Sequence, residues 1–333
     1  MRALLLREPK PAEEGPLVFA ELPVPEPGPG QILVRVRACG VCHTDLHIAE
    51  GDLPLRKSPV VLGHQGVGEV AALGPGVARF RPGQRVGFFW LAWACGQCPF
   101  CRRGQENLCP QARFTGYTVD GGFAEYARVF ADFAFPLPEG VPAVEQAPLL
   151  CAGVVGFRAL KLSGAQKGDL LGLYGFGASA HLVIQAARFL GMRVYVFTRS
   201  SEHREQAREL GAEWVGGPGE RPPEPLDAAL VFAPAGWIVP EALQSTRPGG
   251  TVVLAGIHMS PIPEMPYRLL WGERAVRSVA NATRRDGEEF LRLAQEAGIR
   301  PEVQVFPFEE ANAALLRLKR AEIRGAAVLR VAL

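Results

Sequence analysis

The sequence predicts a chain in two parts: a β-rich first part to about Leu150, then an α/β part with a parallel, doubly wound sheet. Two observations lead to this fold class. Valine-rich runs bounded by glycine and proline turns fill the first part, whereas short apolar runs alternate with helical stretches after Pro148. A length of 333 residues is more than one core needs and fits two domains.

The first part contains the expected strands and two expected loops. Met1–Lys10 predicts a first strand, because its charges interrupt the apolar stretch that a signal peptide needs. Gln31–Ala38 and Gly66–Leu73 predict further strands, and irregular loops are expected over Cys39–Ser58 and Trp90–Tyr117. Turn clusters bound the strands at Pro25–Gly30, Gly74–Gly76 and Arg81–Gly83.

The second part follows the alternation of strand and helix that produces a parallel sheet. The expected strands are Leu170–Tyr174, Arg193–Phe197, Ala228–Phe232 and Thr251–Ile257, and the expected helices are Ala178–Leu190 and Glu202–Leu210. Gly216–Pro225 predicts an exposed connection. After about Ala280, a helix over Gly287–Ala297 and a strand over Ala326–Val331 are expected to rejoin the first domain.

The composition excludes several classes of protein. Hydrophobic residues make up 48% of the chain, charged residues 21%, and the net charge is only +2. Without a basic tract, this charge gives no reason to expect nucleic acid as a partner. No apolar run reaches the length needed to cross a bilayer, so no membrane association is expected. We therefore expect a cytoplasmic protein, in which thiols stay reduced and clustered cysteines usually bind metal.

Four of the seven cysteines form a close-set group in an expected loop. Cys95, Cys98, Cys101 and Cys109 follow the spacing C-x2-C-x2-C-x7-C. Tetrahedral zinc takes four thiolates, and a short run of cysteines can fold around one ion. The bacterial iron–sulfur run ends differently, with three residues and a Cys-Pro, and disulfides are rare in the cytoplasm. The spacing therefore predicts a zinc site.

A glycine motif lies between the first strand and the first helix of the second part. Gly175 and Gly177, followed by the small Ala180, have the spacing that a dinucleotide site uses. The first glycine allows a tight turn, the second lets the backbone approach the pyrophosphate, and the third residue permits close packing of helix and strand. We therefore expect these three residues to bind a dinucleotide.

The end of the second strand predicts which dinucleotide binds. NAD sites usually carry a carboxylate there, which binds the ribose hydroxyls of the adenosine. This chain has Thr198, Arg199 and Ser200 instead, and its next carboxylate is Glu202. A guanidinium and two hydroxyls suit the additional phosphate of NADP(H), although Arg199 could also be an ordinary surface residue. NADP(H) is favoured over NAD(H).

Further motifs carry a resemblance to a known family. Cys42-His-Thr-Asp-Leu-His47 is followed by Gly63-His-Gln65 and later by Leu149-Leu-Cys-Ala-Gly153. With the cysteine group and the glycine motif, these segments resemble the zinc-dependent alcohol dehydrogenases of the medium-chain dehydrogenase/reductase superfamily. Their order covers nearly the whole chain, and the bacterial alcohol dehydrogenase and cinnamyl-alcohol-dehydrogenase-like branches look most similar.

The resemblance implies a domain plan. Residues 1–149 would form a GroES-like β-barrel catalytic domain with a structural zinc lobe at about 90–115. Residues 150–280 would form a Rossmann cofactor-binding domain, and 281–333 a return segment that completes the first domain. The resemblance also suggests a homodimer or homotetramer.

The resemblance further implies the reaction and the role of each site residue. Two zinc ions are expected: a catalytic one on Cys42, His64 and Cys151, and a structural one on the four-cysteine group. The reaction would exchange hydride between an alcohol or aldehyde and the cofactor. Thr44 would take the alcohol proton and pass it through the nicotinamide ribose to His47. His43 would lie against the pyrophosphate, and Asp45 would orient the ligand histidine.

Two alternatives stay open. A polyol or sugar dehydrogenase of the same superfamily is the nearest alternative. Such an enzyme would need hydrogen-bonding side chains near the substrate, where Phe89 and Trp90 are expected here. The other is a dinucleotide-binding relative without catalysis, which would not be expected to retain the ligand and relay residues together.

The chain departs from the family pattern at two places. Relatives commonly have Gly-His-Glu, where this chain has Gln65, and many carry an arginine where Ala326 stands. The second departure puts a phosphate contact from that segment in doubt, although Arg324 could supply one.

Gln65→Glu tests the first departure. The added negative charge near the catalytic zinc should make the metal less electrophilic, so the pH at which bound water ionises is expected to rise. The pH dependence of turnover measures this change. An identical profile for the variant and the parent chain would contradict it.

Overall fold

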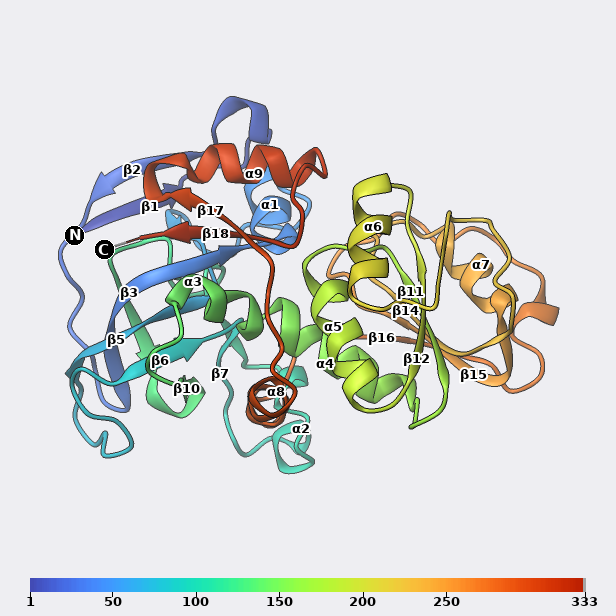
Figure 1. Cartoon of the computed structure of the whole chain (residues 1–333). Helices are drawn as coiled ribbons and strands as arrows, with labels where there is room; N and C mark the ends of the chain where they lie inside the picture. Colours follow the sequence, from blue (N-terminus) through green and yellow to red (C-terminus); the bar gives the residue numbers. More distant parts are fainter. Residues whose placement is uncertain (332–333) are drawn as a thin grey trace. The chain divides into compact units, whose positions relative to one another are not determined.

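A computed structural model describes residues 1–331 as two compact units (Figure 1). Unit 1 comprises Met1–Cys151, Asn281–Glu288 and Pro301 onward, and unit 2 comprises Ala152–Ala280 and Glu289–Arg300. The return segment is therefore divided, whereas we expected all of it to join the first domain. Phe290 explains the division, because it is fully buried and its ring would lie 2.2 Å from a Cβ at Gly153 of unit 2.

Unit 1 is built from largely antiparallel sheets, as the valine-rich runs predict. One sheet has the order β2-β1-β4, a second has β10-β6-β5-β3-β18-β17 with β9 also on β3, and β7 pairs with β8. The strands are β1 (Arg2–Leu6), β2 (Leu17–Glu21), β3 (Gln31–Val41), β4 (Val60–Val61), β5 (Gly66–Leu73), β6 (Arg85–Phe88), β7 (Leu91–Trp93), β8 (Arg113–Phe114), β9 (Tyr126–Phe130), β10 (Ala134–Pro136), β17 (Val303–Pro307) and β18 (Ala326–Arg330).

The long strand β3 organises this unit. It pairs with β5 and β9 from the first part of the chain and with β18 from its end. Its apolar side chains, with those of β1 and β18, form one buried core. The helices of this unit are α1 (His43–Glu50), α2 (Pro99–Arg102), α3 (Ala143–Gln146) and α9 (Ala311–Lys319), and α8 (Arg284–Glu296) begins in it.

Unit 2 contains the predicted parallel, doubly wound sheet, so the predicted fold class is confirmed. Its strand order is β13-β12-β11-β14-β15-β16, and every pair is parallel. The strands are β11 (Leu170–Tyr174), β12 (Arg193–Phe197), β13 (Trp214–Gly216), β14 (Leu226–Val231), β15 (Thr246–Leu254) and β16 (Ala275–Ser278). The helices are α4 (Ala152–Ser163), α5 (Ala178–Phe189), α6 (Ser201–Glu209) and α7 (Ile238–Ser245).

Alternating side chains give this sheet two buried faces. Leu171 and Leu173 of β11 belong to one core with residues of α4, α5 and α6. Leu170 and Tyr174 of the same strand belong to a second core with α7. Because successive strand residues point to opposite faces, a fully apolar strand is what a sheet covered on both sides requires.

One helical stretch corrects the expectation about membrane-length apolar runs. Ala143–Ser163 forms a helical stretch of 21 residues, and an 18-residue window within it has a mean hydropathy of 1.3, long and apolar enough to span a bilayer. However, 61% of this window is buried inside the protein. The stretch is therefore core structure, because a helix that is apolar on most sides is buried in a folded protein.

Candidate functional site

The Cys42–His47 motif lies on a helix, which corrects the predicted loop over Cys39–Ser58. Strand β3 continues to Val41, and α1 begins directly after Cys42. Cys42 is the N-cap, because its sulfur accepts a hydrogen bond from the amide of Thr44 and Asp45 returns one to the amide of Cys42. Gly51 ends the helix at a φ of 87°, where glycine is favoured.

Asp45 connects this helix to the segment that carries His64. Its carboxylate accepts hydrogen bonds from the amide of Cys42 at 3.0 Å and the amide of Gly63 at 3.1 Å. One oxygen also lies 3.2 Å from Nδ1 of His64, as an ion pair without the alignment of a good hydrogen bond. This carboxylate favours a proton on Nδ1, and Nε2 would then be the nitrogen that holds a metal.

Cys42, His64 and Cys151 come together in unit 1 as the predicted catalytic zinc ligands. Their ligand atoms lie within 4.8 Å of one another, and Nε2 of His64 is 3.1 Å from the sulfur of Cys42. His64 is fully buried, and the two cysteines are partly buried. Two thiolates and one imidazole fit a catalytic zinc, because they leave a fourth position for water or substrate.

The protonation of these ligands also fits a metal. A hydrogen bond from Cys151 holds the pKa of Cys42 well below its usual range, against the opposing effect of burial. The same hydrogen bond and burial raise the pKa of Cys151. Burial alone would lower the pKa of His64, but the negative charges of Asp45 and Cys42 raise it. These shifts favour negative charge on Cys42, and a bound cation would take the place of the protons on Cys151 and on Nε2 of His64.

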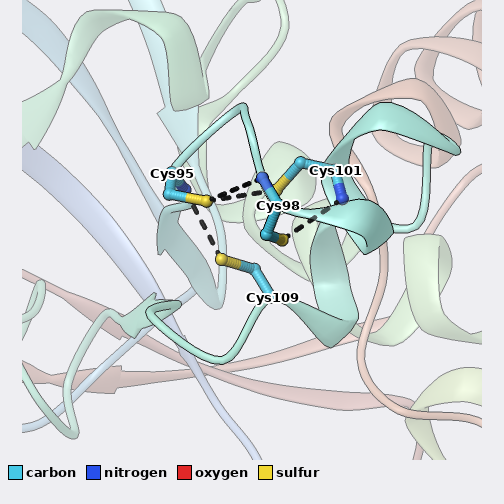
Figure 2. Close-up of side chains that lie close together, drawn as sticks. All are labelled: Cys95, Cys98, Cys101 and Cys109. Carbon is cyan, nitrogen blue, oxygen red and sulfur yellow. Dashed lines mark hydrogen bonds between the residues drawn. The ribbon is translucent and has the colours of Figure 1, made fainter.

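The four-cysteine group also has the arrangement of a zinc site (Figure 2). Its four sulfurs lie within 4.8 Å of one another, and those of Cys95 and Cys101 are 3.9 Å apart. Tetrahedral zinc with bonds of about 2.3 Å needs sulfurs roughly 3.8 Å apart. The four side chains thus match a closed structural site.

Backbone amides donate to these sulfurs, as dashed lines in Figure 2 show. The amide of Cys98 donates to Cys95 at 3.3 Å, and the amide of Cys101 donates to Cys98 at 3.5 Å. Amides of Gln97 and Cys98 lower the pKa of Cys95 to about 6, whereas burial raises that of Cys101 to about 12. Amide donors favour thiolates, so the loop stabilises the charge that zinc requires.

The two residues expected to move the proton, Thr44 and His47, both lie on α1. Thr44 is partly exposed, whereas His47 is buried and its Nδ1 lies 2.8 Å from the carboxylate of Asp52. Sequence reasoning missed Asp52, which stands alone after the glycine that ends α1. His43 is exposed in the first turn, with its ring 6.2 Å from that of His47.

The aromatic side chains before the cysteine group are packed into unit 1. Trp90 is only 6% exposed and stacks on Phe114 and Tyr117, with ring centroids 5.3 and 5.6 Å away. Its ring meets His64 edge to face at 5.0 Å. Phe89 is also buried and contacts Phe135. Trp90 therefore supports the ligand histidine directly.

The glycine motif has the backbone that a dinucleotide site needs. Gly175 has a φ of 87°, and a Cβ there would lie 3.0 Å from the amide nitrogen of Ala233. Gly177 is the N-cap of α5, and nothing lies within 4 Å of where its Cβ would be. Ala180 is fully buried in the core between helix and sheet. The backbone at Gly177 therefore faces open space at the N-terminus of α5, the end of a helix that favours a phosphate.

Thr198, Arg199 and Ser200 follow β12 and differ in exposure. Thr198 is buried, Arg199 is exposed, and the hydroxyl of Ser200 caps α6 by accepting from the amide of His203. Arg204 joins this group, because its Nε donates to the carbonyl of Thr198 at 2.9 Å. Glu220 lies 3.9 Å from Arg204 and accepts from the amide of Gly217.

Comparison with known proteins decides the family. Residues 28–139 match the alcohol dehydrogenase GroES-like domain, and residues 180–296 match the zinc-binding dehydrogenase family. The chain is 46% identical over 335 residues to the probable alcohol dehydrogenase AdhA of Mycobacterium tuberculosis, covering 99% of this chain and 97% of that protein. The chain belongs to the zinc-dependent medium-chain alcohol dehydrogenases.

Solved structures agree with this family. A cinnamyl alcohol dehydrogenase of Sorghum bicolor superposes with a TM-score of 0.90 at 28% identity, over 99% of this dehydrogenase and 97% of that chain. An NAD-dependent alcohol dehydrogenase superposes with the same TM-score at 26% identity and full coverage of both chains. Both units thus have the GroES-like and Rossmann folds that the resemblance implied.

The sequence offers Arg324 as a substitute for the arginine missing at Ala326. Its Nε lies 2.7 Å from the carboxylate of Glu302, and Ala326 is buried in the pairing of β18 with β17. The guanidinium is therefore already neutralised within unit 1.

Asp45→Asn should weaken zinc binding at the catalytic site. Removal of the charge that faces His64 is expected to lower zinc affinity about 10- to 100-fold. Zinc content after dialysis against graded chelator measures the effect. Asp52→Asn is the matched control, since it removes a carboxylate that contacts His47 and no zinc ligand. Equal zinc retention in both variants would contradict the role of Asp45.

Proposed function

We propose that this dehydrogenase interconverts a primary aliphatic or aromatic alcohol and its aldehyde by hydride exchange with NADP(H). The observation that carries the proposal is the convergence of Cys42, His64 and Cys151 within 4.8 Å, next to the helix that bears Thr44 and His47. A bound zinc ion supplies Lewis-acid chemistry that stabilises negative charge on the substrate oxygen. The cofactor supplies the hydride acceptor.

Thr44 and His47 are proposed to carry the alcohol proton away. Thr44 can accept it through its hydroxyl and release its own proton toward His47. An imidazole suits the last position, because it exchanges protons near neutral pH. The carboxylate of Asp52, 2.8 Å from Nδ1, holds the orientation of the ring. We therefore add Asp52 to the proposed relay.

The cofactor phosphates are proposed to bind unit 2. Gly175, Gly177 and Ala180 form the turn into α5, where free amides favour the pyrophosphate. His43 is proposed to contact a cofactor phosphate, as the resemblance to the family implies. Arg199 is the feature that favours NADP(H), because an exposed guanidinium after β12 suits a phosphate better than ribose hydroxyls. Thr198 and Ser200 are proposed to line the same position.

An apolar alcohol is proposed because Trp90 lies edge to face with His64. An aromatic wall beside the metal favours apolar carbon over the hydroxyl groups of a polyol. Polyol or sugar dehydrogenation is the second candidate, and a non-catalytic dinucleotide-binding protein is the third. The ligand and relay residues stand together on adjoining segments of unit 1, which favours catalysis over the third.

A homodimer or homotetramer is proposed on the basis of unit 2. Strand β16 is at the edge of its sheet, and an unpaired edge can add a strand from a second copy. Tyr267 and Trp271 just before it are 74% and 68% exposed, which is unusual for large aromatic side chains.

A cytoplasmic setting is proposed because thiolate zinc sites are maintained where thiols stay reduced.

The proposal is tested by following reduced nicotinamide absorbance with benzyl alcohol, hexanol and hexitols, offering NADP+ and NAD+ separately. We expect reduction with benzyl alcohol and hexanol and a preference for NADP+. A preference for NAD+ would leave the proposed alcohol dehydrogenase activity standing but would overturn the proposed role of Arg199. Activity on hexitols alone would favour the polyol candidate. No reduction, in protein confirmed to hold two zinc ions, would favour the non-catalytic one.

Asp52→Asn tests the proposed proton relay in the same assay. This variant should keep its zinc and bind cofactor normally, yet turn over at least about tenfold more slowly, because proton transfer typically contributes 10²- to 10⁴-fold. Wild-type turnover in this variant would remove Asp52 from the relay and leave the rest of the proposal intact.

A further inference from the structure

The proposed structural zinc lobe contains a buried carboxylate that is not one of the four candidate zinc ligands. Glu106 begins a short 3₁₀ turn, η2 (Glu106–Leu108), which lies between the zinc-site cysteines Cys101 and Cys109. Its side chain is only 11% exposed. Burial of an ionised carboxylate is costly unless hydrogen bonds and an opposite charge compensate for it.

Arg284 provides both forms of compensation. Its Nη2 lies 2.7 Å from Oε2 of Glu106, and its Nε lies 3.0 Å from each carboxylate oxygen. The backbone amide of Arg284 donates to Oε1 at 2.8 Å. The guanidinium also lies over the ring of Phe133, 4.5 Å from its centroid. This forked contact is of the kind that fixes geometry as well as charge.

The partner of Glu106 is 178 positions away in the sequence, in the segment Asn281–Glu288 by which the chain re-enters unit 1. Arg284 begins α8 within this segment, in the same unit as the cysteine loop. Within this segment Thr283 and Asp286 exchange hydrogen bonds of 2.7 to 3.1 Å at the start of α8. Asn281 also donates to the carbonyl of Asn107 in the lobe. These hydrogen bonds fix the conformation of the segment that carries Arg284.

A backbone hydrogen bond couples the position of Glu106 to that of Cys109, a proposed zinc ligand. The amide of Cys109 donates to the backbone carbonyl of Glu106 at 3.1 Å, which fixes where η2 ends and where Cys109 begins. The sulfur of Cys109 in turn accepts from the amide of Cys95 at 3.5 Å. Cys109 is also the buried member of the group. A shift of η2 would therefore displace Cys109 from the other three sulfurs.

We propose that Glu106 and Arg284 are positioning residues for the four-cysteine site, through which the segment Asn281–Glu288 holds Cys109 in place for zinc. The inference rests on the proposed structural zinc. All four ligands come from residues 95–109, so the loop can bind zinc by itself, and the distant segment raises its affinity. Because such coupling is reciprocal, bound zinc also stabilises that segment.

The test compares how fast zinc leaves each site. Glu106→Gln and Arg284→Lys are exposed to a zinc chelator and a thiol alkylating reagent, and mass spectrometry follows each cysteine. We expect the four lobe cysteines to be modified about tenfold faster than in the parent chain, with Arg284→Lys nearer to the parent. Cys42 and Cys151 should keep their original rates.

Glu69→Gln is the matched control. It removes a partly buried carboxylate of unit 1 that pairs with Arg37 of β3 and Arg85 of β6, outside residues 95–109. The lobe cysteines of this variant should react as in the parent chain. Unchanged lobe rates in Glu106→Gln would overturn the inference, as would equal acceleration at Cys42 and Cys151, which indicates general destabilisation. A parent chain with fewer than two zinc ions would instead contradict the two-zinc proposal on which it rests.

Discussion

The catalytic site depends on the carboxylate of Asp45. Its two oxygens bind the amides of Cys42 and Gly63 and face Nδ1 of His64, so one side chain begins α1 and orients a ligand from the next segment. Buried acceptors of this kind are stable only when fully compensated, and two amides and an imidazole provide that compensation. Burial raises the pKa of Asp45, so its ionised form depends on these partners. The contacts of Asp45 thus stabilise the start of α1 and also orient His64.

The sequence was most informative where spacing alone determines geometry. The four-cysteine group could be predicted as one site because its ligands are close in the chain and need little scaffold. The strands and helices of unit 2 follow their apolar periods, which is why β11, α5 and β12 were placed within a residue or two. Cys42, His64 and Cys151 are separated by long stretches, so the family resemblance was needed to group them.

Other features could not be predicted because their signals are unusual or distant. The helix α1 was missed because a cysteine is its N-cap, a position where serine, threonine, aspartate or asparagine is the usual sign. Asp52 gives no periodic signal, and only the fold brings it to His47. Arg284 and Glu106 are too far apart in the chain for either to indicate the other. Phe290 likewise places part of α8 with unit 2 through a contact with Gly153.

Each chain is proposed to bind two zinc ions with different ligands, and zinc X-ray absorption spectroscopy tests this proposal most directly. A tetrathiolate site together with a site of two thiolates and one imidazole predicts two zinc ions per chain and about three sulfur ligands per zinc on average. Cys42→Ala should remove the catalytic ion and move the average toward four sulfurs. One zinc ion per chain, or four sulfurs per zinc in the unaltered protein, would contradict the account.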